Sequence, residues 1–114
     1  MNTKIEVTQL DHLSDARVVV AGDLDDAGGK LTRQQLKRVV ESGKINLVVD
    51  LDGVGTLGSG GLAALIATLR LARDRGGSVR VQASQPHIRK VMELTGLTRI
   101  FRLSPDGAAT HAAA

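Results

Sequence analysis

The chain has 114 residues, a formal net charge of +3 and no cysteine. This length suits one domain with its own core, and the lack of cysteine excludes disulfides, thiolate catalysis and cysteine-based metal sites. No apolar stretch reaches the ~18–20 residues that a membrane span needs, and the N-terminus lacks the apolar segment of a secretory signal. We therefore expect a cytoplasmic protein without membrane insertion.

Basic charge is concentrated in the second half of the chain. Residues 1–52 contain seven basic and nine acidic residues, whereas residues 53–114 contain eight and three. A basic half can favour an acidic partner or nucleic acid. The sequence has one Phe and no Trp or Tyr, so the stacking platforms of single-strand binders are missing. We expect a solvated basic face and no direct contact with nucleic acid.

Two strands are predicted first, followed by a helix. Ile5 and Val7 alternate with polar residues, and Arg17–Ala21 is a β-branched run. The turn between them is short, so these strands should pair antiparallel. The pair Gly28-Gly29 is expected to break the chain, and Thr32 is the expected N-cap of the first helix, with Gln35 as its capping-box partner.

The central strand is predicted over Ile45–Leu51, and five glycines follow it between Gly53 and Gly61. Ser59 is the expected N-cap of a second helix. At ~100° per residue, the residues expected on the sheet are Leu62, Leu65, Ile66 and Leu69. The opposite face is small and apolar where a lone surface helix would be charged, so we expect a partner to cover it. Its members are Gly60, Ala64, Ala67 and Leu71.

A further strand is predicted at Val79–Val81, parallel to the central one because a helix connects them. Pro86 should open a third helix, and Leu97–Phe101 should form a final apolar turn. The order β-β-α-β-α-β-α predicts an α/β fold: a single-domain, mixed and mostly parallel sheet with helices packed on it. We expect the domain to comprise residues 1–103, with 104–114 as a flexible C-terminal tail.

No convincing catalytic or cofactor site is present in the sequence. Gly53–Gly58 spells G-x-G-x-x-G between a strand and a helix, the dinucleotide fingerprint. The acidic ribose ligand expected ~20 residues on is absent at Val81-Gln82, so nucleotide binding is the less favoured alternative. We expect Asp50 and Asp52 to point to opposite faces of the strand end and to form no working pair. The histidines share no metal spacing; they are His12, His87 and His111. We therefore expect neither an enzyme nor a metal or other cofactor.

Several segments together resemble the STAS domain family, and above all its stand-alone bacterial anti-sigma factor antagonists. These segments are Gly22–Asp25, Val48–Val54, Gly58–Leu62, Gly76-Gly77 and Glu93–Leu97. The resemblance covers Ile5 to Leu103 in the family's order. It implies a STAS-like fold and binding to an anti-sigma factor, usually a serine kinase, with release of a sigma factor and regulation of transcription by partner switching.

The resemblance also implies a phosphorylation switch, but this chain departs from it. The family's D-S-S-G signature reads here as Gly58-Ser59-Gly60-Gly61, and the usual phosphoacceptor aligns with Gly60. The switch is thus missing from its usual place, and Ser59 is the neighbouring candidate for phosphorylation. The expected partner-binding residues are Asp23, Asp25, Gly58, Ser59, Gly60, Ala64, Ala67 and Leu71. Two alternatives stay within the family: a subunit of a lipid-transport ABC complex, or a module of a stress-signalling assembly.

Overall fold

The computed structural model describes residues 3–9 and 13–104 of the chain. The strands are β1 (Lys4–Gln9), β2 (Asp15–Leu24), β3 (Asn46–Leu57), β4 (Ser78–Gln82) and β5 (Arg102–Ser104). The helices are α1 (Asp26–Glu41), α2 (Ser59–Asp74) and α3 (Pro86–Leu94), with a 3-10 turn, η1, at Leu97–Arg99.

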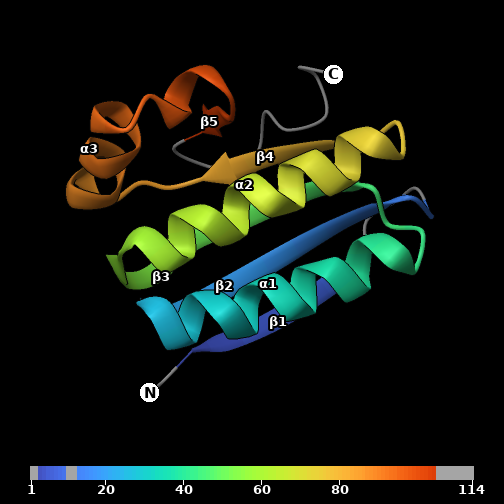
Figure 1. Ribbon diagram of the computed structural model, residues 1–114, viewed down its shortest axis with the longest axis horizontal. Coiled ribbons are helices and arrows are strands. Elements are labelled where there is room, and N and C mark those ends of the chain that lie inside the picture. Colours follow the sequence, from blue (N-terminus) through green and yellow to red (C-terminus); the bar gives the residue numbers. More distant parts are fainter. Residues whose placement is uncertain (1–2, 10–12, 105–114) are drawn as a thin grey trace.

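The five strands form one sheet in the order β1-β2-β3-β4-β5. β1 is antiparallel to β2, and every other neighbouring pair is parallel. α1 and α2 lie side by side across one face of the sheet and run in the same direction (Figure 1). The predicted mixed, mostly parallel α/β sheet is therefore confirmed.

The hydrophobic core lies between the sheet and its helices. Successive strand side chains face opposite sides, so alternate residues of β2 and β3 enter the core; they include Val18, Val20, Val49 and Leu51. Leu65 and Leu69 of α2 are also in the core, and Leu62 and Ile66 pack against it. The apolar periodicity of α2 thus identified its sheet-facing side.

The start of α1 differs from the prediction. α1 begins at Asp26, with Asp25 as its N-cap, so Gly28-Gly29 lies inside the helix and does not break the chain. Thr32 is an interior residue, fully buried, and its hydroxyl has no hydrogen-bond partner in the described part of the chain. The expected capping box at Thr32 is therefore wrong.

β3 is longer than predicted. It continues through Gly53 and Gly55 to Leu57, because this extension pairs with the end of β2 as far as Leu24. The pairing is irregular. Its register shifts between Val19 and Ala21 of β2, and it shifts again between Gly22 and Asp23. The glycine-rich segment is thus mostly strand, and only Gly58 separates β3 from α2.

The end of the domain also contains one more strand than expected. The apolar turn is present as η1, with Leu97 and Phe101 buried. β5 then pairs with β4 and includes Ser104, a residue that the sequence analysis places in the tail. Residues 105–114, the remainder of the predicted tail, lie outside the described residues.

Candidate functional site

The predicted site residues at the starts of α1 and α2 lie together at one end of the molecule. There β2 and β3 end side by side, and α1 and α2 begin. Asp23 pairs with Thr56 across the two strands, and the Thr56 hydroxyl donates to Asp23 Oδ1 at 2.9 Å. The Thr3 hydroxyl donates to the Asp23 carbonyl oxygen at 3.1 Å. We call this region, formed by residues 23–26 and 58–60, the corner.

Asp25 has a structural role in the corner as well as an exposed position. Its Oδ1 accepts a hydrogen bond of 2.8 Å from the Gly28 N–H. A side-chain acceptor at this position satisfies a backbone donor that the first helical turn leaves unpaired, and its negative charge suits the helix N-terminus. The carboxylate therefore holds the start of α1 in place while remaining accessible.

Ser59 is more available than its sequence position indicates. The N-cap of α2 is Gly58, whose N–H donates to the Leu24 carbonyl at 2.9 Å. Ser59 is the first helical residue; it is exposed, and its hydroxyl bonds no residue in the described ranges. The expectation that Ser59 caps the helix is wrong, because Gly58 occupies the N-cap position.

Gly60 fills a position where a side chain does not fit. A Cβ at Gly60 would lie 2.8 Å from both the Asp25 carbonyl oxygen and the Asp26 Cα. A Cβ at Gly29 would lie 2.3 Å from the carbonyl carbon of Gly60. The two helices therefore touch backbone to backbone, and glycine permits this approach.

The expectation that the small-residue face of α2 points outward is only partly correct. Ala64 is 1% exposed, and Gly60 lies against the start of α1, so the chain itself covers this half of the face. Ala67 and Leu71 remain partly exposed farther along the helix. Small residues here serve helix–helix packing, and for Ala64 the outward orientation is wrong.

Two residues of α3 and its approach contact the end of β3, beside the corner, without having been predicted. His87 Nε2 lies 2.8 Å from the Gly55 carbonyl oxygen. Gln85 Nε2 donates to the carbonyls of Leu51 at 3.0 Å and Val54 at 3.1 Å. These contacts fix the irregular end of β3 against α3, and no local spacing in the sequence announces them.

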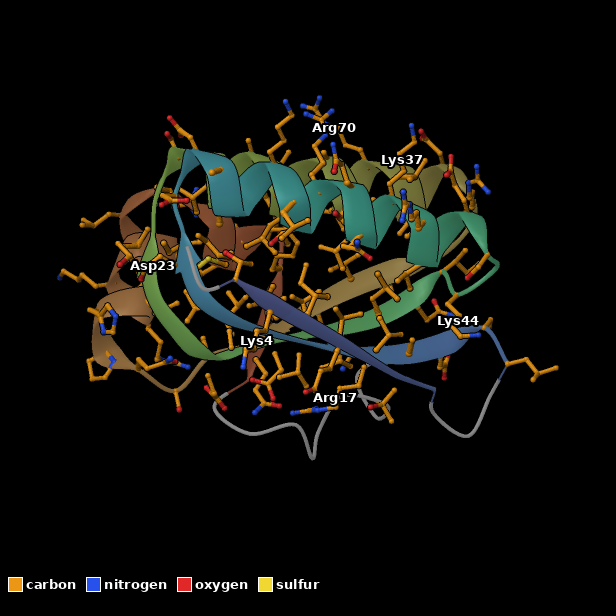
Figure 2. All side chains as sticks on the ribbon, turned by 90° about the horizontal axis from the view of Figure 1, so that it is seen from below. Lys4, Arg17, Asp23, Lys37, Lys44 and Arg70 are labelled. Atoms are coloured by element: carbon orange, nitrogen blue, oxygen red, sulfur yellow. The ribbon has the colours of Figure 1, made fainter. Side chains whose placement is uncertain are left out.

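A polar cluster occupies the face of the sheet opposite the helices, where Figure 2 shows Arg17. Arg17 donates to Asp50 Oδ2 at 2.6 Å and also to Gln82 Oε1. Gln82 Nε2 in turn donates to Asp52 Oδ2 at 2.6 Å. Asp50 and Asp52 therefore share one face, as residues two apart in a strand do. The expectation of opposite faces is wrong.

The same cluster holds Asp52 in its ionised form. Burial alone would raise its pKa, but hydrogen bonds from Gln82 and Ser84, together with the nearby Arg17 charge, outweigh burial and lower the pKa. A carboxylate with a lowered pKa is a poor proton acceptor near neutral pH. The polar groups of the cluster are hydrogen-bonded to one another, and the cluster gives no support to a catalytic role.

The nucleotide alternative loses its structural basis. A dinucleotide fingerprint needs a tight loop whose backbone approaches the pyrophosphate, whereas most of Gly53–Gly58 is paired strand. The Asp23 carboxylate also lies beside this segment, 3.0 Å from where a Cβ of Gly55 would be. An acid here would repel a phosphate.

Within residues 3–9 and 13–104, no three His, Asp or Glu side chains gather closely enough to hold a metal ion. In the same ranges, no helix combines the length and apolar character that crossing a membrane requires.

Comparison with known protein families identifies the fold. Residues 8–104 match the family described as "Mlab, STAS domain". The chain belongs to the STAS domain family. A crystal structure of an anti-sigma factor antagonist from Mycobacterium paratuberculosis superposes with a TM-score of 0.85 at 32% identity, covering 98% of this chain and 93% of that one.

Named relatives of this STAS domain are similar over most of their length. The anti-sigma-F factor antagonist RsfB of Mycobacterium tuberculosis is 35% identical over 101 residues, which are 87% of this chain and 80% of RsfB. The anti-sigma-B factor antagonist of Bacillus subtilis is 27% identical over 104 residues, 91% of this chain and 93% of the relative. These relatives are antagonists of regulatory factors rather than enzymes, in agreement with the sequence analysis.

Proposed function

We propose that this STAS domain is an anti-sigma factor antagonist. It binds an anti-sigma factor in the cytoplasm of a bacterium and thereby releases a sigma factor for transcription. The observation that carries this proposal is the similarity over nearly the whole chain to proteins of that name, at 35% identity to RsfB and 32% to a solved antagonist. The partner fitting the family resemblance is an anti-sigma factor of the serine-kinase type.

The corner is the docking surface in this proposal. Asp23, Asp25 and Ser59 are exposed, and Gly58 and Gly60 are partly exposed beside them. They stand on strand ends and helix starts next to core residues, since Leu24 and Leu57, their neighbours in the chain, are buried. A rigid surface loses little freedom on binding, which favours affinity.

Control by phosphorylation is altered in this chain. At Gly60 there is no hydroxyl, and a side chain would meet the backbone of Asp25 and Asp26. A phosphate on the exposed Ser59 would add about −1.5 to −2 charge near the Asp25 and Asp26 carboxylates and inside the docking surface. The antagonist therefore cannot be switched off by phosphorylation at the usual position and is constitutive in that sense. Ser59 is the remaining candidate acceptor.

Affinity capture from the native bacterium tests the function. The intact protein, immobilised through either terminus, should retain an anti-sigma factor, and Ser59→Glu should lose it while Ser59→Ala retains it. Recovery of a transporter ATPase instead would replace the proposal with the lipid-transport alternative. Incubation with the captured kinase and ATP then tests control: stoichiometric phosphate on Ser59 would overturn the constitutive version.

A further inference from the structure

A groove lies on the outer surface of the helix pair, beyond the corner. Its volume is about 360 Å³. Arg33 and Lys37 line it from α1, while Ala67, Arg70 and Leu71 line it from α2. Figure 2 shows Lys37 and Arg70 on the outer side of the helix layer, away from Asp23. The groove is thus a surface separate from the corner.

The three cations of this groove have no partners of their own. Arg33, Lys37 and Arg70 are exposed, and none makes a hydrogen bond or ion pair with a residue in the described ranges. Arg33 and Lys37 are also four residues apart on one helix, a spacing at which like charges destabilise the helix. The spacing of Arg33 and Lys37 therefore does not help to stabilise α1.

The apolar part of the groove lies between the cations. α1 and α2 run in the same direction, and Gly29 contacts Gly60. Lys37 is eight residues beyond Gly29, and Thr68 is eight beyond Gly60, so Lys37 lies close to the level of the groove's middle. Thr68 is buried and donates to the Ala64 carbonyl at 2.7 Å. Its hydroxyl is therefore occupied, and Ala67 and Leu71 provide the accessible floor.

The residue types select the class of ligand. A small molecule needs an enclosing pocket, whereas Arg33, Lys37 and Arg70, which line this groove, are exposed. Nucleic acid bound as a single strand needs aromatic stacking, but Phe101, the one aromatic residue of the sequence, is 1% exposed. A ligand that carries carboxylates beside an apolar side chain is complementary to a groove with cations around an apolar floor.

We propose that this groove binds an acidic peptide segment of a partner protein, with an apolar side chain on Ala67 and Leu71 and carboxylates on Arg33, Lys37 and Arg70. Asp74, at the C-terminal end of the groove, repels further acid and so orients the segment. This inference stands apart from the proposed function, because it concerns the groove and requires no anti-sigma factor.

A defined probe tests the proposal on the full chain. A short fluorescent peptide of glutamate and leucine should bind saturably and shift the amide resonances of Lys37, Ala67 and Leu71. Lys37→Glu and Arg70→Glu, on different helices, should each weaken binding by about tenfold or more. Arg73→Glu makes the same charge change on α2 outside the groove lining and should weaken it less than about twofold.

Each contrary result overturns the proposal. An equal loss in Arg73→Glu, or equal binding by a glutamate peptide without leucine, would show general attraction to a basic surface. Tighter binding of a single-stranded oligonucleotide at the same resonances would make nucleic acid the occupant. Absence of saturable peptide binding to the folded wild-type chain would remove the site. Circular dichroism of both groove variants checks that they retain the fold.

Discussion

The two ends of the α1–α2 pair are formed by the same two helices but are packed differently. Beside the corner, Gly29 and Gly60 bring the backbones into contact. Farther along, Lys37, Arg70 and Leu71 leave a groove between the helices. Side-chain size along a helix pair therefore sets where the surface is rigid and where it is open. The rigid end suits a preformed docking surface, and the open end suits a flexible segment.

The largest effect is expected from filling the tight end. Gly29→Ala places a Cβ 2.3 Å from the Gly60 carbonyl carbon, so the helices must separate. Alanine normally stabilises a helix interior relative to glycine, yet here we expect a loss of about 3 kcal/mol in unfolding free energy from overpacking. Urea denaturation measures it. In Gly58→Ala the new Cβ is 3.4 Å or more from its neighbours, and this control should lose about 1 kcal/mol or less. Equal losses would contradict the tight contact.

A smaller effect is expected from removing the cap at the corner. Asp25→Ala leaves the Gly28 N–H without its side-chain acceptor and should destabilise the protein by about 1 kcal/mol. Asp25→Ser retains a capping oxygen and should recover most of that loss. Thermal unfolding of both variants separates the effect of the capping hydrogen bond from that of the negative charge. An unchanged melting temperature in Asp25→Ala would show that the corner does not depend on the Asp25 side chain.

At Thr32, between the two ends of the helix pair, a substitution is expected to raise the unfolding free energy. Its fully buried hydroxyl has no hydrogen-bond partner in the described ranges. Thr32→Val keeps the shape and removes the unpaired polar group, so we expect a gain of about 1 kcal/mol in unfolding free energy. Chemical denaturation measures it. Destabilisation instead would indicate that the hydroxyl is bonded in solution.

The smallest effect is expected in the stability at low pH. It concerns Asp52, in the polar cluster on the sheet face opposite α1 and α2. Because folding lowers the pKa of Asp52, its contribution to stability is present above its ordinary pKa and is lost as pH falls through the folded-state value. Asp52→Asn should therefore flatten the pH dependence of stability below about pH 4. Unfolding curves between about pH 3 and 7 measure this slope, and an unchanged slope would contradict the assignment.

Local patterns in the sequence predicted the elements and the sheet-facing residues, but not the neighbours of each face. The periodicity of α2 identified Leu65 and Leu69 correctly as core residues. It also showed that Ala64 lies on another face, but it carried no information about what covers that face. α1 does so, because Gly29 lets α2 approach closely at Gly60, and this contact joins residues far apart in the chain.

The candidate site shows the same division. The Asp23 and Ser59 segments were predicted to lie together, and the pairing of β2 with β3 brings them to one end of the sheet. His87 was not predicted, because its contact with Gly55 depends on where α3 docks. Glycines that end a strand in isolation remain in β3 here, since β2 supplies their backbone partners.

The affinity of the captured anti-sigma factor for Ser59→Glu, compared with wild type and with Arg73→Glu, tests the central claim most directly. The account predicts that an acid at Ser59 weakens binding by about tenfold or more, because it places an unpaired charge inside the docking surface. Arg73→Glu, remote from the corner, should bind within about twofold of wild type. Wild-type affinity in Ser59→Glu would contradict the corner as the docking surface.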